Sequence, residues 1–329
     1  MQKAGRLPGL FVLLCIIAWC AGCTGAVPGT PVPAETPAIA VSPAPSFQDN
    51  TQVVAAAVTS APALSNLSVF FIPVGQGDSI LIITPEQKTM LIDAGPADAA
   101  PEVSGLLRRE NVTALDIALA THAHVDHIGG MPEVLETFPV KEFVWNGHPR
   151  KASPYTKLVA AIAKKDILMT AVSAGDTIDL DPEISIAVLN PPQPGFSDPN
   201  NNSIVLRMTY RNVSFLFTGD AAQDAEAAML AENTTLSADI LKVGHHGNVH
   251  STSAKFLAAV HPSLAIIGVG EAGKGHHPSQ KTLDRLAKMN VTVYRTDRDG
   301  IVEVSTNGTG YAVATFPAVS AIPSAQASA

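Results

Sequence analysis

Cysteine is almost missing from this 329-residue chain, and charge is sparse. The three cysteines lie within the first 23 residues, so residues 24–329 can form no disulfide, no cysteine–zinc site and no thiol nucleophile. Charged residues make up only 15% of the chain and the formal net charge is -8, which argues against a general nucleic-acid coat. Hydrophobic residues, at 46%, are ample for a core and exclude wholesale disorder.

Long apolar runs are also scarce. The run at 10–19 is too short for the roughly 20 residues that a membrane-spanning helix needs. Lys3 and Arg6 precede this run and small residues follow it, so we predict a secretory signal in residues 1–23. The stretch Cys-Ala-Gly-Cys resembles a lipoprotein processing site with Cys23 as the lipidated residue, while an ordinary cleaved signal or an uncleaved anchor stays open. Either way we expect an extracellular protein, anchored to the outer face of the cytoplasmic membrane or secreted.

Two further segments lack the periodicity of folded structure. Residues 24–65 are rich in Pro, Ala, Thr, Ser and Val and carry only Glu35 and Asp49 as charges, which predicts a flexible tether. Residues 318–329 have the same composition, and we predict a disordered tail there. Residues 66–317 remain as one folded domain.

Strand and helix signals alternate within 66–317. The pattern predicts a hairpin near its start, helices between later strands, and three further strand–helix alternations over 238–294. Such a mixture suits two packed sheets with helices outside. The predicted strands are 67–74, 79–84, 89–93, 116–120, 184–189, 204–210 and 214–218, and the predicted helices are 101–110, 130–137 and 155–165.

A loop at 120–130 places three imidazoles and a carboxylate within six residues. His122 and His124 are two apart, so an extended backbone points them the same way. Asp126 and His127 follow a bend and can face a second metal. Imidazole and carboxylate together suit zinc, manganese or iron. A polar surface loop is the alternative, but three histidines in one loop favour a metal site.

This His-x-His-x-Asp-His pattern resembles that of the metallo-β-lactamase superfamily. Further motifs occur in the order seen in the extracellular hydrolase domain of ComEC-type DNA-uptake (competence) proteins and their stand-alone relatives. The resemblance implies an α/β fold, a four-layer αββα sandwich, with two divalent metal ions at one edge of the paired sheets. The motifs are Val-Gly-Gln-Gly-Asp-Ser at 74–79, Leu-Ile-Asp-Ala-Gly at 91–95, Phe-Thr-Gly-Asp at 217–220, Leu-Lys-Val-Gly-His-His-Gly at 241–247 and Tyr-Arg-Thr-Asp at 294–297.

The resemblance implies a role for each matching residue. His122 and His124 match ligands of the first metal, and Asp126 and His127 match ligands of the second. Asp220 matches the carboxylate that bridges both metals, although its position also predicts an N-cap for the following helix. Asp126 and Asp220 are therefore the expected catalytic residues.

Other matches concern late histidines and residues around the metals. His245 matches the histidine that completes the second metal site, and His277 also aligns with a family histidine; we prefer His245. His246 is expected to point away from the metals and to contact the substrate or to support a metal ligand. Asp93 matches an acid that orients the histidine loop, with a simple turn residue as the alternative. Asp78, Asn202 and Ser203 are expected to support the ligands or to contact the substrate.

One departure from the family affects the choice of metal. Many members carry another histidine before the strand that leads to Asp220, where this chain has Pro-Asn-Asn-Asn-Ser at 199–203. The loss of an imidazole weakens zinc binding at the first metal and favours harder ligands, so zinc and manganese both stay open. His148, His250 and His261 have no motif support and are predicted to be surface or structural residues.

Two metals can bind a shared hydroxide, and this hydroxide can attack phosphorus or a carbonyl carbon. The motif alone does not choose the substrate, because one fold hosts many reactions. Residues 242–298 hold eight basic and three acidic residues, which fits a phosphate-bearing substrate or, equally, solvated helix faces. We expect an extracellular phosphodiesterase or nuclease that acts on DNA. The expected partners are a phosphodiester such as single-stranded DNA and, through the N-terminal anchor, the membrane. The alternatives are hydrolysis of a phosphorylated wall component, a lactone or a β-lactam, and a non-catalytic DNA-capture module.

Overall fold

The computed structural model of this chain describes residues 66–232, 234–270 and 277–319. The predicted signal at 1–23, the tether at 24–65 and residues 320–329 of the predicted tail lie outside the described residues. Within the described ranges, no helix combines the length and the apolar character needed to cross a lipid bilayer.

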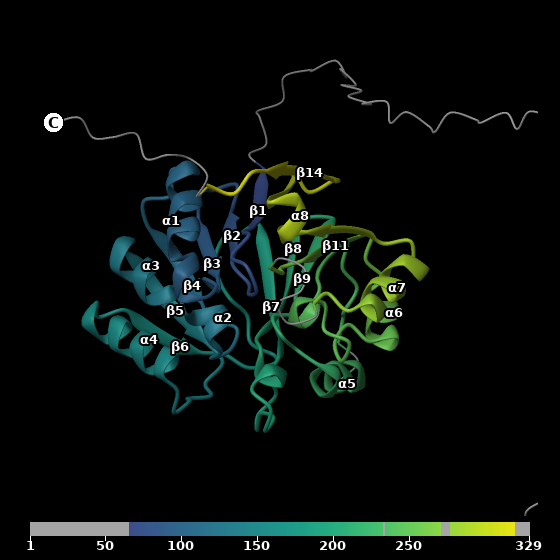
Figure 1. Cartoon of the computed structure of the whole chain (residues 1–329), viewed down its shortest axis with the longest axis horizontal. Coiled ribbons are helices and arrows are strands. Elements are labelled where there is room, and N and C mark those ends of the chain that lie inside the picture. Colours follow the sequence, from purple (N-terminus) through teal and green to yellow (C-terminus); the bar gives the residue numbers. More distant parts are fainter. Residues whose placement is uncertain (1–65, 233, 271–276, 320–329) are drawn as a thin grey trace, which may run out of the picture. The chain divides into compact units, whose positions relative to one another are not determined.

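Two β-sheets lie face to face at the centre of the molecule (Figure 1). The first has eight strands, in the spatial order β14 (Tyr311–Phe316), β13 (Ile301–Thr306), β1 (Leu67–Phe71), β2 (Ile80–Ile83), β3 (Thr89–Ile92), β4 (Leu115–Leu119), β5 (Val140–Trp145) and β6 (Leu168–Ala171). The second has six, in the order β12 (Thr292–Arg295), β11 (Leu264–Ile267), β10 (Ile240–Lys242), β9 (Val213–Phe217), β8 (Val205–Tyr210) and β7 (Ile184–Asn190).

Alternation along the strands divides the apolar side chains between two faces. In β1, Val69 and Phe71 join the core between the two sheets, whereas Phe70 packs under the helices outside the first sheet. In β9, Phe215 and Phe217 face the inner core, and Leu216 points to the helices outside the second sheet. Because side chains of a strand point alternately to opposite faces, strands that are apolar throughout must be covered on both sides.

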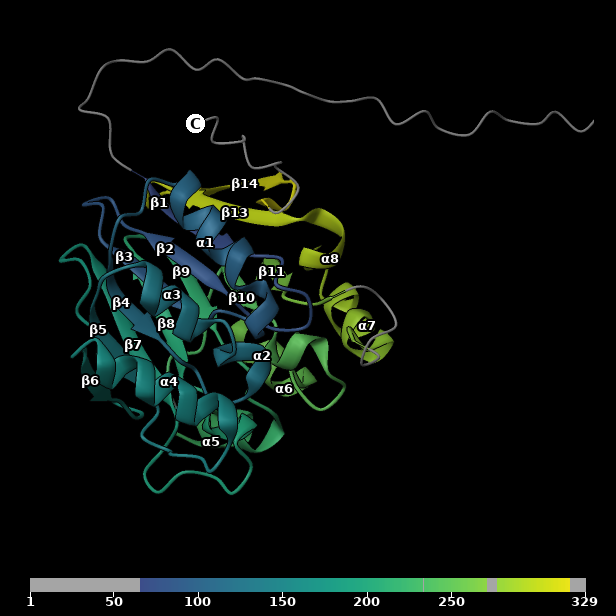
Figure 2. The same ribbon diagram turned by 60° about the vertical axis from the view of Figure 1, so that its left-hand side comes forward.

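Helices supply that cover. The first sheet is covered by α1 (Ala100–Arg109), α3 (Met131–Thr137) and α4 (Ser153–Lys164), and the second by α5 (Gln223–Ala231), α6 (Ala254–Val260) and α7 (Gln280–Lys288), as Figures 1 and 2 show. The predicted four-layer αββα sandwich is therefore confirmed. Short helical segments make up the remainder: η1 (Ala97–Ala99), α2 (Val125–Ile128), η2 (Asn200–Asn202), η3 (Gly244–Gly247) and α8 (Thr296–Asp299).

Local sequence signals explain where the helices begin. The three helices over the first sheet each carry proline in the first turn, where its missing N–H costs no hydrogen bond. At the start of α6, the Ser253 hydroxyl accepts a hydrogen bond from the backbone N–H of Phe256 at 3.3 Å.

Most predicted elements are present, and four strands were not predicted. The predicted hairpin is the antiparallel pair β2–β3, and the three predicted helices correspond to α1, α3 and α4. The unpredicted strands are β5, β6, β13 and β14. In β5 the charged pair Lys141 and Glu142 interrupts the apolar pattern, and β6 is an edge strand with no fully buried side chain. Val319, assigned by the sequence to the tail, donates its backbone N–H to the Glu102 carboxylate on α1.

Candidate metal centre

Four loops meet at one edge of the paired sheets. Asp93 follows β3, His122 follows β4, Asp220 follows β9, and His246 follows β10. The pairs β3–β4 and β9–β10 are both parallel, so the carboxyl ends of their strands lie at the same edge. Residues that follow such strands converge in space although the chain separates them widely.

The first cluster consists of His122, His124 and Asp220. His122 Nε2 lies 3.0 Å from His124 Nδ1 and 3.8 Å from Asp220 Oδ2. The two imidazoles point the same way, as their spacing in the sequence predicts. His122 is buried and His124 is half-buried, so this cluster opens toward solvent on the His124 side.

The second cluster consists of Asp126, His127, Asp220 and His246. Asp220 Oδ1 lies 3.2 Å from His127 Nε2 and 3.4 Å from His246 Nε2. Asp126 Oδ2 lies 3.5 Å from the same nitrogen of His246. Asp220 thus belongs to both clusters, with Oδ2 toward the first and Oδ1 toward the second. This is the placement that a bridging carboxylate requires.

Three buried atoms of the second cluster fit a bound cation. His127 Nε2, His246 Nε2 and Asp220 Oδ1 make no hydrogen bond of acceptable geometry within the described residues. Buried polar atoms are rarely left unpaired, and these three come from three different loops and converge on one point. Imidazole nitrogens and carboxylate oxygens are ligands that zinc, manganese and iron accept. The residues therefore fit a divalent metal ion.

Asp93 orients the histidine loop, as the resemblance implied. Its Oδ2 lies 2.8 Å from His127 Nδ1 and accepts a hydrogen bond from the Thr121 hydroxyl at 2.6 Å. Its Oδ1 accepts the Thr121 backbone N–H at 2.8 Å. Because Nδ1 of His127 is engaged by Asp93, Nε2 is left to face the second cluster.

Ser203 contacts two residues of the first cluster, whereas the Asn202 side chain contacts neither cluster. The Ser203 hydroxyl accepts the backbone N–H of Asp220 at 3.0 Å and lies 3.3 Å from His122 Nδ1. The Asn202 side chain instead accepts the backbone N–H of Phe196 and donates to its carbonyl, both at 2.7 Å. Asn202 therefore gives the first cluster no replacement for the imidazole that many family members have nearby.

A different asparagine caps the helix that follows Asp220. The Asn201 side-chain oxygen accepts the backbone N–H groups of Ala222 at 3.1 Å and Ala225 at 3.3 Å, at the start of α5. The prediction that Asp220 also caps this helix is therefore wrong. Its carboxylate is left for the two clusters.

The positions of His245 and His246 correct the sequence-based expectation. His246 does not point elsewhere: it is buried, and its Nε2 is in the second cluster. Its Nδ1 donates to the Gly268 carbonyl at 2.8 Å, which fixes the ring. His245 Nε2 lies 3.6 Å from Asp220 Oδ2, on the side of the first cluster, and its ring centroid is 5.9 Å from that of His277. Neither cluster includes His277.

The backbone conformation explains why His246, and not His245, lies in the second cluster. His245 and His246 have φ values of 49° and 54°, in the left-handed region that non-glycine residues seldom adopt. The chain therefore turns sharply after β10, and strand alternation no longer determines which imidazole points inward.

Electrostatics within the site oppose the effect of burial. Burial alone lowers the pKa of His246, but the Asp220 and Asp78 carboxylates outweigh it and raise that pKa to about 9. Burial likewise opposes protonation of His127, yet Asp220 and Asp93 hold its pKa well above the usual range. Without a cation, protonated imidazoles balance the carboxylates at this point.

Lys242 is an unexpected inner residue. It is one of the eight basic residues of the segment 242–298, but its side chain is buried and its Nζ lies 2.7 Å from Asp78 Oδ2. Two other cations of the same basic segment are also engaged: Arg285 donates to the Ser251 carbonyl at 2.8 Å, and Arg295 pairs with Asp297. The basic balance of residues 242–298 therefore does not describe one free surface.

Sequence reasoning missed Arg150. Its Nη1 lies 3.1 Å from His124 Nε2, and the positive charge adds to burial in lowering the pKa of that imidazole. Arg150 belongs to the loop between β5 and α4 and to no motif, so its only signal in the sequence is its charge. The three histidines without motif support also differ: His250 and His261 are exposed, whereas His148 lines a cavity.

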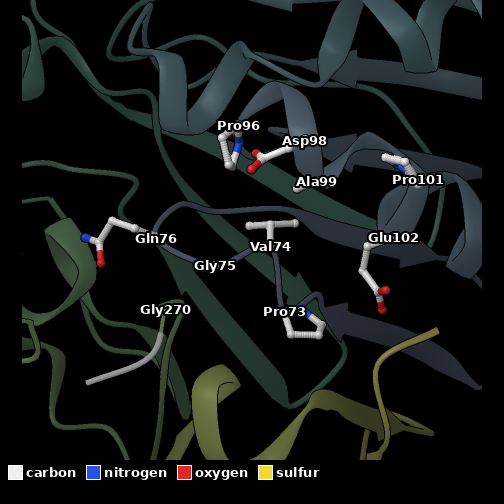
Figure 3. A pocket seen from close by; sticks show the side chains of 10 residues that line it. All are labelled: Pro73, Val74, Gly75, Gln76, Pro96, Asp98, Ala99, Pro101, Glu102 and Gly270. Atoms are coloured by element: carbon white, nitrogen blue, oxygen red, sulfur yellow. The ribbon is translucent and has the colours of Figure 1, made fainter. Parts of the chain in front are cut away.

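A cavity of about 530 Å³ lies between the β1–β2 loop and the start of α1 (Figure 3). Asp98 and Glu102 lie along one wall, and Gln76 extends from the other. The same β1–β2 loop reaches the histidine loop, because the backbone N–H of Asp78 donates to the Asp126 carbonyl at 3.3 Å.

Three curated proteins are similar to this chain. ComE operon protein 3 of Bacillus subtilis is 31% identical over 260 residues, which is 74% of this chain and 33% of that protein. Recombination protein 2 of Haemophilus influenzae is 28% identical over 237 residues, 70% of this chain and 28% of that protein. Competence protein ComA of Neisseria gonorrhoeae is 27% identical over 231 residues, 70% of this chain and 31% of that protein. The chain thus spans about a third of the length of these relatives.

A family model supplies the wider assignment. The model described as the metallo-beta-lactamase superfamily matches residues 72–270, a range that contains every residue of both clusters. The fold, the shared carboxylate of Asp220 and this match agree, and the chain belongs to the metallo-beta-lactamase superfamily.

Proposed function

We propose that this chain is a metal-dependent phosphodiesterase that hydrolyses the backbone of DNA. The observation that carries the proposal is the shared position of Asp220, whose two oxygens face two separate groups of imidazoles. Divalent metal ions held by paired clusters of this kind supply Lewis acidity and an activated water for in-line displacement at phosphorus.

The residues themselves have distinct tasks in this proposal. Asp220 holds the two clusters together, and Asp93 fixes the tautomer and direction of His127. Asp126 and His245 are partly exposed, with side-chain exposures of 29% and 23%, so they lie on the side from which a substrate can approach. Burial lowers the pKa of His245, which leaves its imidazole neutral at pH 7 and able to accept a proton.

The choice of DNA rests on the relatives. Two of them are named for recombination and for competence, processes in which DNA is handled. A phosphodiester also suits this centre, because metal ions held by the two clusters around Asp220 would neutralise charge on the phosphoryl oxygens. The non-catalytic alternative is disfavoured by the intact His-x-His-x-Asp-His motif, whose four side chains all lie in the two clusters.

We also propose that the protein acts outside the cytoplasmic membrane, anchored through Cys23. The short apolar run and the Cys-Ala-Gly-Cys stretch support this location. Both lie outside the described residues, so the proposal rests on sequence alone.

One experiment tests the reaction class. The purified chain is stripped of metal, reloaded with zinc or manganese, and offered single-stranded DNA, bis-p-nitrophenyl phosphate, a lactone and a β-lactam. We expect metal-dependent cleavage of both phosphodiesters, which Asp126→Ala and Asp220→Asn abolish together with bound metal. His250→Ala, at an exposed histidine, is the matched control and should keep full activity. Folded, metal-loaded protein that cleaves the lactone or β-lactam but spares both phosphodiesters would refute the proposal.

A further inference from the structure

A second cavity, of about 360 Å³, adjoins the first cluster. One wall is the loop after β5, which carries His148, Arg150 and Lys151, and the other is the loop before η2, which carries Phe196 and Ser197. Ala123, between the two histidines of the first cluster, also lines it. Arg150 reaches from this cavity to His124, with 3.1 Å between Nη1 and Nε2. A molecule in the cavity would therefore lie directly beside the metal centre.

The cavity has a single sign of charge. Arg150 and Lys151 line it, and none of the residues that line it is acidic. Among the described residues, the cavity beside the start of α1 has the reverse character, since Asp98 and Glu102 line it and no basic residue does (Figure 3). An anionic substrate that approaches the first cluster is therefore attracted on the Arg150 side.

The walls of the cavity are tied to the histidine loop. The buried Asn146 side chain donates to the carbonyl of Asn202 at 2.8 Å and to that of Thr121 at 3.3 Å. Its oxygen accepts the backbone N–H of His148 at 3.0 Å. One amide therefore joins both walls to the residue that precedes His122. This is a built recess and not a gap between loose loops.

Close approach of the two walls depends on a glycine. A Cβ added at Gly195 would lie 2.4 Å from Asn202 Oδ1 and 2.4 Å from the His148 ring. A larger side chain there would have to displace the Asn202 amide or the His148 ring. The Asn202 amide closes the same loop by its two hydrogen bonds to Phe196. Asn202 thus lines the recess, which gives this predicted site residue a place outside the metal clusters.

We propose that this recess binds a second phosphate of the substrate, adjacent to the phosphate that is cleaved. The inference rests on the proposed phosphodiesterase function and narrows its substrate to a chain with at least two neighbouring phosphates. Arginine recognises phosphate through its planar, forked donors, and lysine adds a point charge. The recess thereby selects single-stranded oligonucleotides over small diesters.

The test measures binding without catalysis. A 5′-fluorescein-labelled oligothymidylate is titrated with the metal-stripped full chain at several salt concentrations, and affinity is read from fluorescence anisotropy. Lys151→Ala and Arg150→Ala are compared with Lys157→Ala, which removes an exposed positive charge from nearby α4 but does not line the recess. We expect each recess variant to weaken binding about 3- to 10-fold and to reduce the salt slope by about 0.7. The control should match the wild type.

A kinetic comparison accompanies the binding measurement. With metal restored, Lys151→Ala should raise KM for the oligonucleotide several-fold more than KM for bis-p-nitrophenyl phosphate, which has no second phosphate to reach the recess. Metal content is measured for Arg150→Ala, because this residue touches His124. If Arg150→Ala loses metal but binds the oligonucleotide as tightly as the wild type, Arg150 positions His124. That result would contradict its proposed role in binding phosphate.

The outcomes separate this inference from the function on which it rests. Wild-type protein that binds the oligonucleotide through Lys151 but cleaves no phosphodiester would refute the phosphodiesterase and keep the recess as a phosphate site. Protein that cleaves phosphodiesters while Lys151→Ala and Lys157→Ala behave alike would refute the recess. Absence of salt-sensitive binding by the wild type would also overturn it.

Discussion

Lys242 and Asp78 form a buried ion pair that joins the two sheets below the second cluster. Lys242 ends β10 in the second sheet, and Asp78 lies in the β1–β2 loop of the first. Their side chains are only 1% and 2% exposed, and Nζ lies 2.7 Å from Oδ2. The other carboxylate oxygen of Asp78 is 3.6 Å from His246 Nδ1. The pair therefore sits where the loops of both sheets support a residue of the metal centre.

Removal of the lysine should leave a buried charge without a partner. We expect Lys242→Met to lower the free energy of unfolding by about 3–5 kcal/mol, measured by urea denaturation. The double variant Lys242→Met with Asp78→Asn should recover much of that loss, because no isolated carboxylate remains. Lys255→Met, at an exposed position on α6, is the control and should change stability little. Equal effects of the two methionine variants would contradict the role of the pair.

The two neighbouring histidines should differ in metal binding. We expect His246→Asn to remove the ion of the second cluster and His245→Asn to keep it, because only His246 lies among Asp126, His127 and Asp220. Asparagine tolerates the left-handed backbone found at both positions, so neither variant should fail merely through strain. Elemental analysis after dialysis measures the outcome. A larger loss of metal in His245→Asn would show that His245 is the ligand, as the sequence first suggested.

Stability of the metal-free protein should fall at alkaline pH. Although burial opposes it, the carboxylates of Asp220 and Asp78 raise the pKa of His246 from 6.5 to about 9. The protonated imidazole therefore contributes its full stabilisation below pH 6.5, and this contribution is lost as the pH rises through 9. The free energy of unfolding should fall by about 3 kcal/mol over this range. Asp220 has a pKa well below its usual range and stays ionised throughout this window.

Urea denaturation of metal-stripped protein between pH 6 and pH 10 measures this loss. His246→Asn lacks one of the two imidazoles whose pKa is raised, since His127 remains, and its stability should decline less than that of the wild type. Metal-loaded wild type should also resist the change, since a bound cation takes the place of the proton. A metal-free wild type with the same pH profile as His246→Asn would disprove the assignment.

Membrane attachment should depend on Cys23. We expect Cys23→Ala to leave the protein unprocessed or to move it from the membrane fraction to the medium, because the substitution removes the acceptor of the lipid. Cys15→Ala changes a cysteine outside the Cys-Ala-Gly-Cys stretch and serves as the control. Fractionation followed by immunoblotting measures both. Unchanged processing and membrane content in Cys23→Ala would rule out lipidation at this residue.

Several features of the site follow from short stretches of sequence. The spacing of His122 and His124 was enough to predict that their rings point the same way, because an extended backbone repeats every two residues. The hairpin β2–β3 and the prolines that begin α1, α3 and α4 were equally local signals. The order of the motifs then implied the αββα sandwich and the central place of Asp220.

Only the tertiary structure decided which residues those features bring together. The left-handed turn after β10 carries His246, and not His245, into the second cluster. The sheet packing buries Lys242 against Asp78, and the loop after β5 brings Arg150 to His124. Local sequence determines periodicity and helix starts, because these depend on neighbouring residues. The direction of a side chain beyond the end of a strand, and the partner of a charge, depend on segments distant in sequence, so they became visible only once the two sheets were packed.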